Sequence, residues 1–244
     1  MGTYSLLTVS GNPKTIKSDK KNKYLTAILH LRPESTKICP YQNIAGCKTA
    51  CLNTAGRGGI FKKGETTNVI QEARKRKTRL FLTAKDIFMD YLVDDITKFE
   101  RYCKRKGKLP AVRLNGTSDI QWETIKINNY NNIFEAFPDI QFYDYTKIPT
   151  RKVDDIPNYH LTWSYSEANT KYSKLFDSVI NNIAVVFKGT LPDSFKGRKV
   201  IDGDKTDLRF LDQHNVVVGL KAKGKAKLDT SGFVISWGRR TINK

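Results

Sequence analysis

The chain has 244 residues, 39% of them apolar, so it is long enough to bury a sizeable core. Its 43 Lys and Arg exceed its 24 Asp and Glu and give a formal net charge of +19. No apolar run approaches the roughly 20 residues that cross a bilayer, and the first residues lack the basic and long apolar regions of a signal peptide, so we expect a cytoplasmic protein without membrane contact.

The chain begins with a basic segment, 1–23, and the first predicted strand follows it at 24–31. A loop rich in cysteine and glycine, 39–59, comes next and leads into a long helical region. The second half of that region, 84–106, places apolar residues at three- and four-residue steps, which predicts an amphipathic helix. These residues are Phe88, Leu92, Ile96, Phe99 and Cys103. We therefore assign Cys103 to the core.

Six further runs of β-branched and aromatic residues predict strands at 111–118, 140–147, 159–166, 183–189, 199–204 and 216–224. A helix is predicted at 167–181, with Tyr172, Leu175, Phe176 and Val179 on one face. Several of the strands do not alternate apolar with polar residues, as is typical of strands buried on both faces of a parallel sheet. The order of elements predicts a single α/β domain over 1–244, with a mostly parallel sheet curved into an incomplete (βα) barrel and helices outside.

Polar residues collect where the predicted strands end, which is where α/β folds place their sites. They include Asn115, Ser118 and Asp119; Asp144 and Lys147; Ser164, Ser166 and Asn169; Asp202; and Lys221. These residues predict an active site at the carboxyl ends of the strands. Polar turns without a catalytic role are the alternative.

Three of the four cysteines, Cys39, Cys47 and Cys51, follow the first strand with the spacing C-x7-C-x3-C. Three thiolates suit an iron–sulfur cluster that leaves one iron open. A closed zinc site would need a fourth ligand, which His30 could supply.

A cysteine nucleophile would instead need a histidine partner, for which His160 and His214 are available. Gly56, Gly58 and Gly59 then fit a loop that passes close to an inorganic group or an anion.

The cations cluster at 17–23, 73–79, 101–108, 197–199 and 219–227. Such clusters attract polyanions, of which nucleic acid is the most common, and we take Lys75, Arg76 and Lys77 as candidate contacts. The sequence contains no helix-turn-helix, zinc-finger or RNP motif, so the mode of binding stays open.

Long segments of the chain resemble the phage gene product 88 family, over nearly its whole length. The segments are GNPKT (11–15), CPYQNIAGCKTACLNTAGRGG (39–59), RLNGTSDIQWE (113–123), FPDIQFYDYTK (137–147), YHLTWSYSEAN (159–169), VIDGDKTDLRFLD (200–212) and VVGLKAKGKAKLDTSGFV (217–234).

A more distant resemblance is to a phage family that is similar to radical S-adenosylmethionine (radical SAM) enzymes. It rests on three cysteines after the first strand, on Thr146-Lys147-Ile148-Pro149-Thr150-Arg151, and on Ser166-Glu167-Ala168-Asn169. The cysteine spacing here differs from the usual C-x3-C-x2-C of those enzymes, and Ala50 stands where an aromatic residue commonly precedes their last cysteine.

This resemblance implies a [4Fe–4S] cluster on Cys39, Cys47 and Cys51, with S-adenosylmethionine on the open iron. It also implies that Asn115, Gly116, Thr117 and Ser118 contact the methionine amino group, that Ser164, Ser166 and Asn169 contact the ribose, and that Asp144, Lys147, Asp202 and Lys221 face the substrate. The leading hypothesis is therefore a phage-type, radical SAM-like iron–sulfur protein that acts on or near nucleic acid. The alternative is a non-catalytic, basic nucleic-acid-binding protein with a structural zinc or iron–sulfur site.

Overall fold

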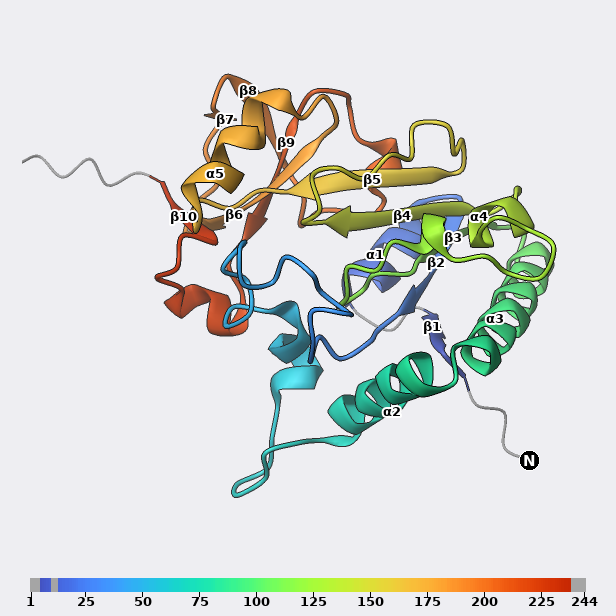
Figure 1. Ribbon diagram of the computed structural model, residues 1–244. Helices are drawn as coiled ribbons and strands as arrows, with labels where there is room; N and C mark the ends of the chain where they lie inside the picture. Colours follow the sequence, from blue (N-terminus) through green and yellow to red (C-terminus); the bar gives the residue numbers. More distant parts are fainter. Residues whose placement is uncertain (1–4, 10–12, 238–244) are drawn as a thin grey trace, which may run out of the picture.

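The computed structural model describes residues 5–9 and 13–237 and shows helices packed around a ten-stranded sheet (Figure 1). The strands are β1 (Leu7–Val9), β2 (Tyr24–Leu29), β3 (Leu109–Arg113), β4 (Gln141–Thr146), β5 (Tyr159–Ser164), β6 (Ile183–Lys188), β7 (Ser194–Phe195), β8 (Arg198–Asp202), β9 (Val217–Lys221) and β10 (Val234–Ser236).

The α-helices are α1 (Pro13–Lys21), α2 (Val69–Thr83), α3 (Lys85–Arg105), α4 (Ile133–Ala136) and α5 (Thr170–Ser173). Short 3-10 helices are η1 (Leu52–Thr54), η2 (Gly56–Gly59), η3 (Trp122–Thr124), η4 (Lys174–Ser178), η5 (Arg209–Leu211) and η6 (Gly224–Leu228). None of the helices within the described ranges is both long and apolar enough to cross a bilayer.

The sheet is mostly parallel, in the order β1-β2-β3-β4-β5-β6-β9-β8-β7. Every neighbouring pair from β2 to β8 is parallel, whereas β1 pairs antiparallel with β2 and β7 pairs antiparallel with β8. β10 lies off this path and pairs with the last three residues of β6. The end strands β1 and β7 are not paired with each other in the described structure, so the sheet is open.

Both faces of the central strands are buried. Phe142 of β4 packs into the main core with Phe88 and Leu92 of α3, while the next residue, Tyr143, packs on the opposite face with Ala111 and Leu208. Consecutive residues of a strand point to opposite faces, so β4 is covered on both sides. This explains why the predicted strands lack a simple apolar–polar alternation.

All seven strands predicted from the sequence are present, and they form the parallel path from β2 to β8. The helix predicted at 84–106 is α3, and its five apolar-stripe residues, Cys103 included, are buried. A mixed α/β fold with a mostly parallel sheet is therefore confirmed.

The helix predicted at 167–181 is much shorter than expected. One α-helical turn begins at Asn169, whose side chain accepts from the Tyr172 backbone N–H, and the chain then continues as 3-10 helix to Ser178. Hydroxyls bond to nearby carbonyls, Ser173 to that of Thr170 (3.0 Å) and Ser178 to that of Leu175 (2.8 Å). Such local bonds compete with a regular helix. Tyr172 and Phe176 are nonetheless buried.

Candidate functional site

A cavity of about 530 Å³ lies at the carboxyl ends of the parallel strands. It is lined from Ile28 and His30 at β2, from Arg113 and Asn115 at β3, and from the ends of β4, β5 and β9. Cys39, Cys47 and Cys51 all line this one cavity. Cys103 does not, because it is fully buried in α3 among the residues of the main core.

The loop that carries the cysteines is anchored at its middle. The Ser166 hydroxyl, just beyond β5, donates to the Ala45 carbonyl (2.7 Å), and the Ser231 hydroxyl, just before β10, donates to the Gly46 carbonyl (3.0 Å). Gly46 has a φ of 64°, and a Cβ there would lie 2.6 Å from the Cβ of Ala168. The loop therefore requires glycine at this position, where it touches two strand ends from the second half of the chain.

Two of the glycines at the end of the loop, Gly58 and Gly59, serve packing within the protein. A Cβ on Gly59 would lie 1.9 Å from the Thr54 carbonyl oxygen. Gln71 of α2 donates its side-chain amide to the carbonyls of Asn53 (2.6 Å) and Gly58 (2.7 Å). At Gly58 and Gly59 the close approach is to other parts of the protein, whereas the sequence predicted one to an inorganic group or an anion.

Burial dominates the electrostatics of the three thiols and raises the pKa of each. The pKa of Cys39 is raised further by Asp119 and by the other two cysteines. Lys147 partly opposes the rise in the pKa of Cys47, and the Asn53 backbone N–H does the same for Cys51. Without a further cation the thiols are neutral and poor nucleophiles. A bound metal would favour the thiolate forms.

The segment Asn115–Ser118 forms one wall of the cavity and is held by its own hydrogen bonds. The Asn115 side-chain oxygen accepts from the Ser118 hydroxyl (2.9 Å) and from the Trp122 indole (3.2 Å). The Asn115 backbone N–H donates to Asp144 (2.7 Å). A Cβ on Gly116 would lie 2.6 Å from the Leu29 carbonyl oxygen, so this wall sits directly against β2.

Lys147 directly follows β4 and lines the cavity. The ammonium donates to the carbonyls of Ser164 (2.9 Å) and Tyr165 (3.3 Å) and lies 4.3 Å from the centre of the Phe233 ring. Burial lowers its pKa to about 8, against the opposing influence of Cys47 and Asp119. Ser164 and Lys221 also line the cavity.

Four predicted site residues lie outside the cavity lining. Asp144 is fully buried behind Asn115, and burial raises its pKa to about 7. Ser166 binds the cysteine loop, Asn169 caps α5, and Asp202 accepts from the Asp204 backbone N–H (2.9 Å). These four side chains support the site from outside it.

The predicted nucleic-acid contacts lie on α2. Lys75 and Arg76 are exposed, whereas Lys77 is partly buried and donates to the Leu6 carbonyl. Burial lowers the pKa of Lys77, with Asp95 opposing. Only Lys75 and Arg76 of the three are therefore fully available to a ligand.

Sequence reasoning missed several charged residues of the cavity: Lys14, Arg74, Arg113, Asp207 and Lys223. Asp207 pairs with Lys14 (3.0 Å) and with Arg113 (3.4 Å). Arg113 could have been found from the two-residue period of β3, because it shares a face with Ala111. Lys14 and Arg74 reach the cavity from helices, and no local pattern in the sequence marks them.

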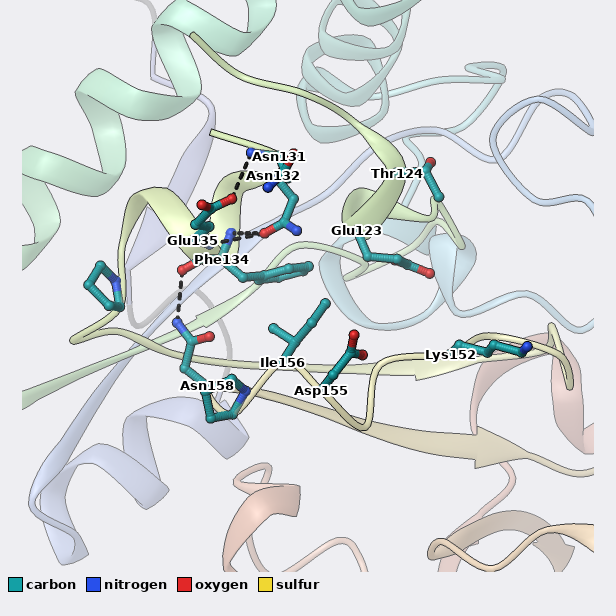
Figure 2. A pocket seen from close by; sticks show the side chains of 12 residues that line it. Glu123, Thr124, Asn131, Asn132, Phe134, Glu135, Lys152, Asp155, Ile156 and Asn158 are labelled. Atoms are coloured by element: carbon teal, nitrogen blue, oxygen red, sulfur yellow. Dashed lines mark hydrogen bonds between the residues drawn. The ribbon is translucent and has the colours of Figure 1, made fainter. Parts of the chain in front are cut away.

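A second hollow, of about 650 Å³, lies near the amino ends of β4 and β5 (Figure 2). Two of its asparagine side chains are engaged with the backbone around them. The Asn158 amide donates to the carbonyls of Phe134, Phe137 and Ile140, and the Asn132 side chain caps α4. The amino ends of parallel strands usually serve stability, so we place the functional site at the cysteine cavity.

One of the three histidines, His30, belongs to this site. His30 lines the cavity, and burial together with Arg74 and Arg113 lowers its pKa to about 3. His160 and His214 are not among the lining residues, so a Cys–His nucleophile is not formed there. Within the described ranges, no group of three or more His, Cys, Asp and Glu side chains is arranged to hold a metal ion.

A family model described as gene product 88 matches residues 5–236. No curated protein and no solved structure matches the chain.

Proposed function

The chain belongs to the gene product 88 family, and from the cavity described above we propose that it is a phage-type, radical SAM-like iron–sulfur protein that acts on or near nucleic acid. The observation that carries this proposal is the convergence of three free cysteines on one cavity at the carboxyl ends of parallel strands. Three thiolates leave one iron of a [4Fe–4S] cluster open, and an open metal position beside polar groups is a catalytic arrangement.

The cysteine cavity suits a cluster better than a single metal ion. Each thiolate of a [4Fe–4S] cluster binds a different iron, so the three sulfurs need not meet at one point. Ligands of zinc must meet at one point, which is a stricter requirement on the three sulfurs. Cys39, Cys47 and Cys51 would hold the cluster, which when bound supplies the electron for reductive cleavage of S-adenosylmethionine.

The remaining walls of the cavity offer groups for a zwitterionic cofactor and a substrate. Asn115, Gly116, Thr117, Ser118 and Ser164 all line the cavity, where they would contact the methionine and ribose parts of S-adenosylmethionine. Lys147 and Lys221 would then face the substrate. Asp144, Ser166 and Asn169 act by positioning these walls.

Anaerobic purification should yield protein with about four iron and four sulfide per chain and the broad visible absorption of a [4Fe–4S] cluster. Once reduced, this protein should bind S-adenosylmethionine and release 5′-deoxyadenosine and methionine. Zinc in place of iron would support the alternative, a non-catalytic binding protein with a structural metal. A full cluster with neither cofactor binding nor cleavage would show that the fold lacks the chemistry.

Nucleic-acid binding should depend steeply on salt, because each neutralised phosphate releases a counterion. The double change Lys75→Glu and Arg76→Glu should weaken binding several-fold and reduce the slope of log affinity against log salt by about 2. Cys47→Ser should bind nucleic acid as the wild type does. Fluorescence anisotropy over a salt series measures these effects. Absence of salt-dependent association with DNA or RNA would contradict the nucleic-acid part and leave the cluster untouched.

A further inference from the structure

A second basic element, the lysine arm, covers residues 221–227, from the last residue of β9 onward, with the sequence Lys-Ala-Lys-Gly-Lys-Ala-Lys. Its two alanines are buried in an apolar cluster with Ala50, Phe233 and Val234, while all four lysines are exposed. The alternation thus fixes the arm to the protein through small apolar side chains and leaves all four lysines accessible to solvent.

The lysine arm runs along the rim of the cysteine cavity. Lys221 and Lys223 line the cavity itself. Further along, η6 contacts η1 of the cysteine loop, and the Cβ direction of Gly224 points at the Thr54 carbonyl oxygen from 3.6 Å. The arm therefore starts inside the cavity and leaves over its edge.

The cavity that the arm enters is itself cationic. Six Lys and Arg line it against three Asp, which leaves three positive charges in excess. All three carboxylates have cationic partners: Asp207 pairs with Lys14 and Arg113, Asp204 with Lys223, and Asp119 with Arg151.

Two cationic groups in this cavity retain unused hydrogen-bond donors. The buried Nε of Arg113 has no hydrogen-bond partner within the described structure. The ammonium of Lys221 forms no hydrogen bond or ion pair with another described residue. A ligand with several anionic groups matches this arrangement.

We propose that the lysine arm lays a single nucleic-acid strand across the mouth of the cavity and that one nucleotide of the strand enters it. This inference rests on the nucleic-acid part of the proposed function. The cavity has the size of a small-molecule site, so it can admit one nucleotide but not a duplex. The phosphates meet Lys221 and Lys223 at the mouth, and Lys225 and Lys227 hold the strand outside. Tyr41, which also lines the cavity, offers a ring on which a base can stack.

Protection of the cavity thiols against alkylation tests the proposed position of the strand. The full chain, reduced and free of metal, is treated with N-ethylmaleimide with and without a saturating short oligothymidine strand, and each cysteine is followed by mass spectrometry. We expect the strand to slow the alkylation of Cys47 and Cys51 at least tenfold. Cys103, buried elsewhere, is the internal reference.

Two variants with equal loss of charge separate the arm from α2. Lys225→Glu with Lys227→Glu should weaken binding at least tenfold and abolish the protection even at saturating strand. Lys75→Glu with Arg76→Glu should weaken binding but keep the protection at saturation. Circular dichroism checks that both variants are folded. We expect both to fold, because all four changed side chains are exposed.

Four results would overturn the proposed position of the strand or its premise. Binding of the strand to the wild type without protection, or equal protection by a duplex, would disprove the single strand in the cavity while nucleic-acid binding stands. Unchanged binding and protection in the arm variant would exclude the arm. Lack of any binding to the wild type would instead refute the nucleic-acid part of the proposed function.

Discussion

Replacement of Cys51 with alanine is expected to abolish the uptake of iron and sulfide by the anaerobic protein, and with it the cleavage of S-adenosylmethionine. Cys51 lines the cavity with Cys39 and Cys47, and a cluster that loses one of only three thiolates loses a third of its protein ligands. Iron and sulfide assays, visible absorption and 5′-deoxyadenosine release measure the effect. Cys39→Ala and Cys47→Ala should behave in the same way.

Cys103→Ala is the matched control, because it removes a thiol from the same chain at a fully buried position in α3. It should keep the cluster and the cleavage while losing some stability through the small cavity that it creates. Equal cluster content in Cys51→Ala and the wild type would exclude the proposed ligand set. Loss of the cluster in Cys103→Ala, with the fold intact, would do so as well.

Replacement of Asp207 with asparagine should lower the free energy of unfolding by about 3–5 kcal/mol. Asp207 is a buried residue of the cavity wall, where it pairs with Lys14 (3.0 Å) and Arg113 (3.4 Å) and accepts from the Tyr143 hydroxyl (3.1 Å). The change leaves Arg113 buried without its carboxylate. Urea denaturation of the metal-free chain measures the loss.

The free energy of unfolding that Asp207→Asn loses should also depend on pH in a defined direction. Burial alone would raise the pKa of Asp207, but Arg113 and Lys14 hold it well below its usual range. A carboxyl whose pKa is lowered in the folded state stabilises the protein fully when the pH is above its pKa in the unfolded chain, about 3.9. This stabilisation disappears as the pH falls through the pKa in the folded state. The difference between wild type and Asp207→Asn should therefore be constant from about pH 5 to 8 and shrink below about pH 4.

Asp94→Asn on α3 is the matched control, because Asp94 forms an exposed pair with Lys98 four residues on. Its loss should cost about 0.3–0.5 kcal/mol. If Asp207→Asn cost no more than this exposed pair, the buried ion pairs would not stabilise the fold.

Much of the fold could be predicted because its signals are local. The strands at the centre of the sheet are rich in β-branched and aromatic residues, and Phe88 to Cys103 repeat with the period of a helix. The short strands β1, β7 and β10 were missed because two or three residues carry no pattern. The helix at 167–181 was predicted too long because its serines bond to nearby carbonyls instead.

The cavity could be predicted only in part. The strand-end rule placed Asn115, Lys147 and Lys221 at the same edge as the three cysteines, and all of them line the cavity. The same rule could not distinguish a side chain that faces the cavity from one that supports it, as Asp144 and Ser166 do. Their roles depend on hydrogen bonds between segments far apart in the chain.

The hydrogen bond from Ser231 to Gly46 joins residues 185 positions apart, and this separation sets an order of events during synthesis. The cysteine loop leaves the ribosome early, but its partner emerges only with the last strand. At the usual rate of translation, on the order of ten seconds pass between synthesis of Gly46 and synthesis of Ser231, and the loop cannot be fixed in place before then. Assembly of the cavity, and loading of any metal into it, therefore follows synthesis of the segment that contains Ser231.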